Sequence, residues 1–362
     1  MNTLLTARAL RALGAAASGA AAIFMTTPAM ADEGHVNALD HAPIGVMGDH
    51  RHAKGEWMIS YRLMHMDMGG VQIGTDSVDP DTVVTTIPNR FFGNPGQPPT
   101  LRIVPTEMRM DMHMAGMMYG LSDDVTLMVM ANYWSKEMDH ITYQGGMGTT
   151  QLGTFRTSPA GFGDTKVAAM IGLSDTVHIN AGLSIPTGSI NKTDDILTPM
   201  GGNPTVRLPY PMQLGSGTWD LEPGITYRDQ NAAFGWGAQL RGTLRLGENS
   251  QGYAHGDRVM ATAWLAASIT DAVALSGRVE AASKGRVDGI DPMIMGPVQT
   301  ANPDFHGGES VTGLLGVNFA ATGGALKGWR LGIEGGVPLV QDLNGPQMPT
   351  DYTVTVGVQK SF

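Results

Sequence analysis

Apolar and polar residues alternate along almost the whole chain after residue 55. A period of two is the pattern of β-strands whose two faces meet different surroundings. In the final segment, for example, Val354, Val356 and Val358 fall on one face, and threonine and glutamine fall on the other. Most of the expected strands have ~10–14 residues, the length that a tilted strand needs to cross a bilayer. Twelve are expected: 56–68, 106–119, 125–138, 161–172, 177–187, 217–227, 233–246, 257–268, 273–283, 309–320, 328–339 and 351–362.

The connections between these strands alternate in length. Five short turns rich in Gly, Ser, Asp and Asn alternate with longer segments such as 69–105 and 188–216. Short turns at one end, long loops at the other and an even strand count are typical of bacterial outer-membrane barrels. We therefore expect an all-β fold, a transmembrane antiparallel β-barrel of about 12 strands over residues 56–362. A secreted β-sandwich would explain the alternation, but it would not explain this rhythm of loops.

Aromatic residues support a membrane location. Trp57, Trp236 and Trp329 lie near the short-turn ends of their strands on the apolar face, together with Tyr227 and Phe362. Aromatic girdles mark the interfaces of membrane barrels. A terminal Phe at the end of an alternating strand also resembles the signal by which outer-membrane barrels are recognised for assembly. The expected location is the outer membrane of a Gram-negative bacterium.

The N-terminal region differs from the rest of the chain. Residues 1–31 read as a signal peptide, with Arg8 and Arg11, an apolar stretch and an A-x-A site ending at Ala31. Residues 32–55 contain four histidines and no strand pattern, which predicts a short periplasmic N-terminal segment. Removing the signal peptide takes the formal charge from −10 to −12, which excludes a nucleic-acid binder. The chain has no cysteine and so no disulfide or thiolate metal site.

Three glycine-rich stretches resemble one known family. They are Gly161-Phe162-Gly163-Asp164-Thr165-Lys166, Ser184-Ile185-Pro186-Thr187-Gly188 and Leu214-Gly215-Ser216-Gly217-Thr218-Trp219-Asp220-Leu221. Together they are similar to the outer-membrane transporter family labelled for the phenol-degradation (meta) pathway. The resemblance extends over most of residues 43–362, and it implies a single barrel that acts in outer-membrane transport. The methionine and histidine content of this chain sets it apart from the ordinary family pattern.

Methionines gather in the first three strands, where 13 of the 25 lie between Met58 and Met138. In the second strand they alternate with charged residues and a histidine, and a charge near the middle of the bilayer would cost ~2–4 kcal/mol. We therefore expect the charged face of this strand to look into the lumen and its methionines to face lipid. In the first and third strands the opposite parity predicts inward-facing methionines. The lipid-facing set is Met108, Met110, Met112, Met114 and Met118, and the inward set is Met58, Met64, Met66, Met68, Met128, Met130 and Met138.

This parity predicts a lumen wall that mixes thioethers with one carboxylate and one imidazole. Thioether and imidazole are soft or borderline ligands that suit Cu(I). The candidate metal contacts are Met64, Met66, Asp111, His113, Met128 and Met130. The alternative is a narrow lumen packed with flexible apolar side chains. His50 and His52 form a second candidate site at the periplasmic mouth, although a flexible histidine-rich tail would look the same.

No catalytic motif is present: a nucleophile elbow, a Walker A loop, G-x-G-x-x-G and H-E-x-x-H are all absent, and no enzyme is expected. The leading hypothesis is a channel for small solutes with a copper-contacting surface in the lumen. The alternative is a binding or structural barrel with a plugged lumen that transports nothing. The expected partners are outer-membrane lipid, a small-molecule or metal-ion solute and a periplasmic protein.

Overall fold

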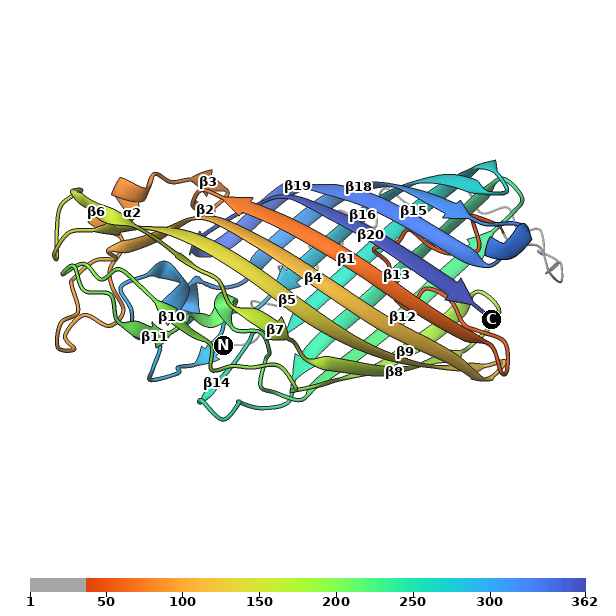
Figure 1. Cartoon of the computed structure of the whole chain (residues 1–362), viewed down its shortest axis with the longest axis horizontal. Helices are drawn as coiled ribbons and strands as arrows, with labels where there is room; N and C mark the ends of the chain where they lie inside the picture. The colour runs from red at the N-terminus through yellow and green to blue at the C-terminus, as the bar shows by residue number, and fades with distance from the viewer. Residues whose placement is uncertain (1–36) are drawn as a thin grey trace.

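The computed structural model describes residues 37–362, so the predicted signal peptide lies outside the described residues. Twelve long antiparallel strands form the body of the molecule (Figure 1). Among residues 37–362, no helix is long and apolar enough to cross a membrane. The strands are β1 (Trp57–Gly69), β4 (Ile103–Ser122), β5 (Val125–Tyr143), β8 (Thr165–Gly172), β9 (Val177–Ile185), β12 (Asp220–Gln230), β13 (Phe234–Arg245), β15 (Arg258–Thr270), β16 (Val273–Lys284), β18 (Gly308–Ala320), β19 (Trp329–Gln347) and β20 (Thr350–Ser361).

The sheet closes on itself. Strand β1 pairs with β4 on one side and with β20 on the other, and β18 pairs with β19, so each long strand has two neighbours. Closure removes the free edges that a sheet cannot expose to lipid. The prediction of a 12-stranded antiparallel barrel is confirmed.

Some strands are longer than expected. Strands β5 and β19 have 19 residues each and run well past the predicted ends at 138 and 339, and β4 has 20 residues and is three residues longer than predicted at each end. The predicted strand 161–172 is instead divided into β7 (Ala160–Phe162) and β8, with Gly163 and Asp164 between them. The barrel is therefore taller on the β4–β5 side than a bilayer requires.

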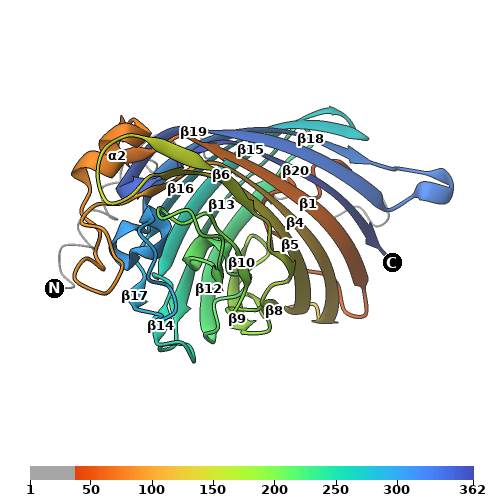
Figure 2. The same cartoon turned by 60° about the vertical axis from the view of Figure 1, so that its left-hand side comes forward.

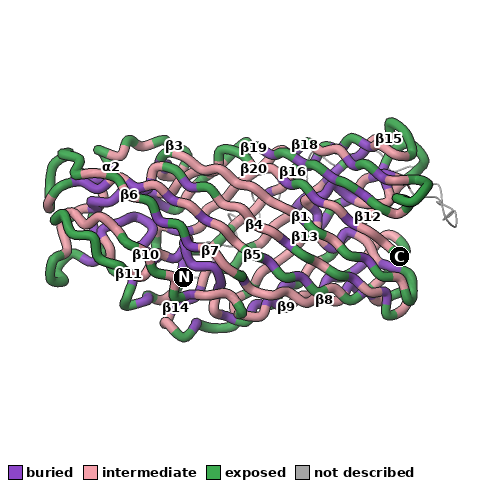
Figure 3. The backbone as a smooth tube through the Cα atoms, in the orientation of Figure 1, coloured by how far each residue is buried: buried purple, intermediate pink, exposed green. Residues whose placement is uncertain are grey.

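The two ends of the barrel differ (Figures 1 and 2). The C-terminus and the short turns lie at one end, which is the periplasmic end of such a barrel. The long loops form a cap at the other end, where Figure 3 marks much of the chain as buried. The further elements are β2 (Gln72–Gly74), β3 (Asp76–Ser77), α2 (Pro80–Thr86), β6 (Gln151–Thr157), β10 (Thr193–Asp195), β11 (Thr205–Arg207), η1 (Tyr210–Met212), β14 (Tyr253–Ala254), β17 (Asp288–Gly289), η2 (Gln299–Ala301) and η3 (Pro303–Phe305) in the long loops, and η4 (Gly324–Leu326) in a short turn.

The three glycine-rich stretches meet at one carboxylate. Asp164 accepts hydrogen bonds from the backbone N–H groups of Gly188 (2.9 Å) and Ser216 (2.7 Å). A Cβ on Gly188 would lie 2.6 Å from the Cα of Gly215, so only glycine permits this close approach. The motif residues therefore fasten both ends of the loop 186–219 to the break between β7 and β8.

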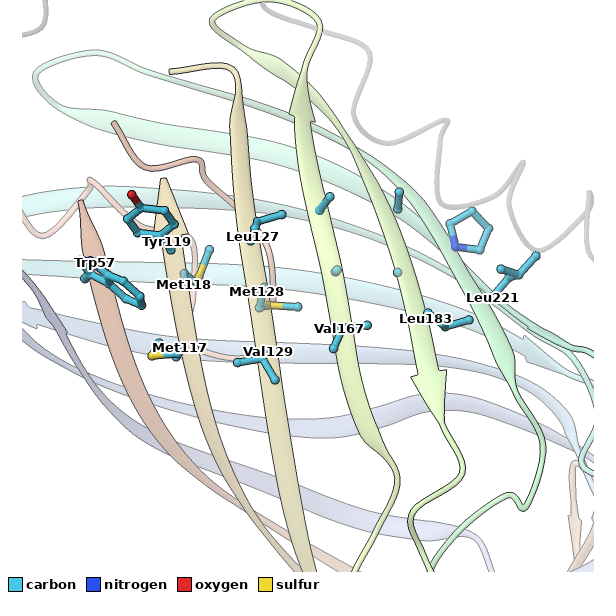
Figure 4. Close-up of a pocket in the computed structure, with 15 residues that line it drawn as sticks. Trp57, Met117, Met118, Tyr119, Leu127, Met128, Val129, Val167, Leu183 and Leu221 are labelled. Carbon is cyan, nitrogen blue, oxygen red and sulfur yellow. The ribbon is translucent and has the colours of Figure 1, made fainter. Parts of the chain in front are cut away.

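The outer wall of the periplasmic half is apolar. Ile59, Tyr61, Leu127 and Val129 are exposed on this surface, and Trp57 packs against Tyr119 at its lower edge with ring centroids 4.5 Å apart. Small residues of β8 and β9 leave a hollow of 720 Å³ in the same wall, and Figure 4 shows the apolar side chains around it. A surface of this kind is stable only against hydrocarbon. The barrel is that of an outer-membrane protein, as predicted.

The segment 37–55, called the plug below, lies inside the periplasmic end of the barrel. Its N-terminal part begins at the β15–β16 turn, where Ala38 donates a backbone hydrogen bond to Asp271 (2.8 Å). Its C-terminal part leaves beside the β4–β5 turn, where Lys54 N–H donates to the carboxylate of Asp123 (3.0 Å). The sequence predicted a short periplasmic stretch or a flexible tail, but these residues are instead packed against the inner wall.

The middle of the plug crosses the lumen. Arg330 of β19 donates to the carbonyl of Ala42. His178 of β9 lies 2.9 Å from the carbonyl of Gly48 through its Nε2 atom, on another part of the wall. Contacts to strands that are distant around the barrel show that the plug spans the lumen rather than lining one side of it.

A pair of glycines makes room for the plug. Gly332 of β19 and Gly357 of β20 face each other in the register. A Cβ on Gly332 would lie 2.6 Å from the Cβ of Ile44, which is 1% exposed. Ile44 therefore packs into space that the side chain of any residue larger than glycine would occupy.

Gly332→Val should displace the plug. Overpacking of this kind costs about 1–3 kcal/mol, which corresponds to a roughly 5- to 150-fold larger open population. Limited trypsin cleavage after Arg51 in the refolded barrel should speed up accordingly. Gly335→Val is the matched control, because a Cβ there meets nothing within 4 Å. Equal cleavage rates in the two variants would contradict the packing of Ile44 against Gly332.

Candidate functional site: the lumen between two closures

The register of β1, β4 and β5 assigns twelve of their thirteen methionines to the lumen. Met58 is buried beside the exposed Trp57, and Met58 lies opposite Met118, which lies opposite Met128. Directly opposed residues share one face of a sheet. Twelve methionines thus form an inner surface, called the methionine wall below: Met58, Met64, Met66, Met68, Met108, Met110, Met112, Met114, Met118, Met128, Met130 and Met138.

The predicted orientation of the second strand is therefore wrong. The methionines of β4 at even positions face the lumen, whereas Asp111 and His113 lie on the outer surface. There His65 Nδ1 lies 2.7 Å from an Asp111 carboxylate oxygen, and Tyr61 Oη lies 2.7 Å from His113 Nδ1. The assumption that charges must avoid the outer face holds only within lipid. This half of β4 continues past the apolar belt, so its charges meet water.

The remaining predicted contacts divide into two groups. Met64, Met66, Met128 and Met130 are inward, as expected, but Asp111 and His113 do not join them. His50 and His52 lie in the plug, with ring centroids 4.8 Å apart. The predicted methionine contacts therefore share one inner surface, but the predicted carboxylate and imidazole lie outside it. The histidines of the plug form a separate group at the periplasmic end of the lumen.

The opposite side of the lumen carries ion pairs. Arg278 binds Glu334 through two hydrogen bonds of 2.8 Å, and its third donor reaches Glu280 at 2.8 Å. Lys166 of β8 pairs with Glu222 of β12 at the edge of the methionine wall, where Lys166 lies opposite Met130 in the register. Buried charges need such partners to offset their lost hydration. Arg278 of β16 and Glu334 of β19 therefore meet inside the barrel on strands outside the methionine wall.

The extracellular loops enclose an apolar pocket of 510 Å³. Ile294 and Val298 belong both to its lining and to a buried cluster with Tyr210 and Tyr253. Leu208 lines the same pocket and also packs with Met108 and Met138 of the methionine wall. Leu208 therefore separates the pocket from the lumen.

A lysine holds the loop of Leu208 in the barrel. Lys136 of β5 donates from Nζ to the carbonyls of Pro211 (2.7 Å) and Gln213 (2.6 Å). These bonds fix η1, and they place the fully buried Met212 beside Leu208. This closure is not predictable from the sequence, because a loop that folds inward has the same composition as one that folds outward.

His306 stabilises the loop cap as a neutral imidazole. It is 8% exposed and its Nε2 lies 3.1 Å from the carbonyl of Thr300. Burial, with a smaller contribution from Lys284, lowers the pKa of His306 from 6.5 to about 3. The unfolded loop therefore takes up a proton below pH 6.5 that the folded loop does not, and folding of the loop becomes less favourable between pH 6.5 and 3.

The cap should loosen in acid. Between pH 7.5 and pH 5 the loss at His306 is about 2 kcal/mol. Backbone hydrogen exchange of residues 297–307, corrected for the intrinsic exchange rate at each pH, should therefore be faster at pH 5 than at pH 7.5. His306→Gln should remove the part of this pH dependence that comes from His306, while His255 in the same cap, whose pKa is also lowered by burial, keeps its own part. An equally steep pH dependence in this variant would exclude His306 as its source.

The fold and lumen define a class, the outer-membrane β-barrels with an internal N-terminal plug. No family model and no curated protein sequence matches the chain. The COG4313 outer membrane channel from Pseudomonas putida F1 is similar in fold, with a TM-score of 0.55, 14% identity, and coverage of 88% of this chain and 99% of that one. The P. putida toluene transporter TodX (TM-score 0.42, 10% identity, 86% and 91% covered) and the KdgM porin (0.36, 9%, 84% and 99%) are more distant.

Proposed function

We propose that this barrel is an outer-membrane channel for small solutes that enter through the extracellular pocket and pass along the methionine wall. The observation that carries the proposal is the position of Leu208, which lines the pocket and touches the methionines below it. An apolar pocket with few polar groups suits small, largely apolar molecules. The similar fold of a known channel agrees with this function but does not identify the solute. The phenol-degradation label stays a prediction.

Passage requires two closures to move. Leu208 and Met212 close the extracellular side, and the plug closes the periplasmic side. Both are held by hydrogen bonds and packing rather than by covalent links, so each can open without disturbing the barrel. The alternative is a barrel that stays closed and serves as a binding or structural element.

Planar-bilayer recordings distinguish these two functions. Leu208→Ala/Met212→Ala should raise the conductance, because it removes the side chains between pocket and lumen. Met147→Ala is the control, because Met147 lies in another extracellular loop, is 79% exposed and does not line the pocket. Large-to-small changes of this kind cost ~2–5 kcal/mol each, so heat-modified gel mobility must first confirm folding. No conductance in any of the three proteins would favour the closed, non-transporting barrel.

A second candidate function is contact with a soft metal ion in the lumen. It is favoured by the twelve thioethers that the register places on one inner surface. Thioethers suit Cu(I) and Ag(I), and weak multiple contacts allow an ion to move on. The same side chains also suit apolar solutes, because methionine adapts its shape to what it touches.

Substitution by leucine separates the two roles of methionine, since leucine keeps the volume and removes the sulfur. Met64→Leu/Met66→Leu/Met128→Leu/Met130→Leu removes four of the twelve thioethers and should lower the amount of sulfur-coordinated Ag(I), measured by X-ray absorption on the refolded barrel. Met117→Leu/Met200→Leu is the control, because both residues are exposed outside the lumen. Sulfur coordination that is equal in all three proteins would reduce the methionine wall to packing.

A further inference from the structure

The plug contains a cluster of imidazoles around one carboxylate. His41, Asp49 and His50 each offer a ligand atom, and these atoms all lie within 4.8 Å of one another. The rings of His41 and His50 are 4.3 Å apart between centroids and nearly perpendicular. His52 lies next to His50 on the other side. Three imidazoles in 12 residues converge although no strand or helix forces them together.

Each of these histidines keeps a buried nitrogen without a hydrogen-bond partner. The atoms are His41 Nδ1, His50 Nε2 and His52 Nε2. A buried polar atom without a partner is costly, and three in one place call for an explanation. A bound ion would satisfy them together.

Asp49 prepares His50 for such a ligand. His50 Nδ1 lies 2.9 Å from Asp49 Oδ1, and Asp49 Oδ2 accepts the backbone N–H of Ala42 at 2.8 Å. A histidine that donates from Nδ1 to a carboxylate has its free electron pair on Nε2, the unpartnered atom here. Carboxylate–histidine pairs of this kind orient ligands in many metal sites.

The surrounding charges select the kind of ion. Arg228 and Arg330 lie near His41, and both guanidinium groups interact electrostatically with the carboxylate of Asp49. Because these arginines already outnumber the carboxylate, each further positive charge on a bound ion makes binding less favourable, which favours a monovalent over a divalent ion. A closed zinc site also needs four ligands in a tetrahedral arrangement. Imidazole is a ligand for copper, and a site with only two imidazoles among arginines suits a monovalent ion with few ligands better than zinc.

We propose that His41 and His50, with Asp49 as orienting carboxylate, bind a monovalent soft metal ion of the Cu(I)/Ag(I) class inside the plug. His52 lies beside this site, with its ring against that of His50, and is not one of the ligands. The site is on the periplasmic side of the lumen and needs no solute passage to form. This inference therefore goes beyond the proposed function and does not depend on it.

The test uses Ag(I), which keeps its oxidation state in air. The refolded full-length barrel in detergent is titrated calorimetrically, and the ligand atoms of the bound ion are read by X-ray absorption. Wild type should bind one tight Ag(I) with nitrogen ligands. His41→Gln/His50→Gln should lose this ion, and Asp49→Asn should weaken it about 10- to 100-fold. His65→Gln is the matched control, because His65 lies on the outer surface.

The four-methionine variant described above separates this site from the methionine wall, because it should keep the nitrogen-coordinated ion. Heat-modified mobility on gels confirms that each variant is folded. Sulfur-only coordination, or unchanged binding in His41→Gln/His50→Gln, would overturn the proposal. Tighter binding of Zn²⁺ than of Ag(I) would overturn the choice of a monovalent ion. Conductance is recorded in a separate experiment. If the barrel proves not to be a channel, the Ag(I) titration still tests the metal site in the plug.

Discussion

The whole structure depends on the closure of the sheet between β1 and β20. In hydrocarbon every backbone N–H and C=O must find a partner within the protein, and a closed ladder of antiparallel strands achieves this. Met58 pairs with Ser361 and Met64 with Thr355 in that seam, which also fixes the register of the first strand. Once this register is set, alternation decides for each residue of the wall whether it meets lipid or the lumen.

Much of the fold follows from that alternation and could be predicted. All twelve long strands, the two unlike ends and the aromatic belt were expected from periodicity and loop length. Charges inside the barrel pair with one another, as Arg278 and Glu334 do deep in the lumen. These predictions succeed because they rest on local patterns that the bilayer imposes on each strand separately.

The orientation of β4 could not be predicted in the same way. Its charged residues were assigned to the lumen because lipid excludes charge, but half of this 20-residue strand lies beyond the apolar belt. The pairing of β4 with β1 shows the true orientation, because Asp111 lies opposite His65 on the outer face. Pairing each strand with its neighbour before assigning faces would have identified the methionine wall.

The plug was missed for another reason, because its contacts come from strands far apart in the sequence. Arg330 and His178 hold it from distant parts of the wall, and neither residue carries a local sign of that role. The facing glycines Gly332 and Gly357 were the available signal, since a strand interior weakens with glycine unless another part of the chain approaches closely. The cluster of His41, Asp49 and His50 became visible only when this segment was placed inside the barrel.

The most direct test is to lock the plug to the wall. The chain has no cysteine, so Ile44→Cys/Gly357→Cys introduces the only thiols. A Cβ on Gly357 would lie 2.8 Å from Cγ1 of Ile44. The sulfur of Ile44→Cys would take the place of this Cγ1 atom, so the two cysteines are close enough for a disulfide. If the plug closes the path, the oxidised barrel should be silent in planar bilayers and should open after reduction. Equal conductance in both states would show that solutes pass beside the plug, and would contradict the account.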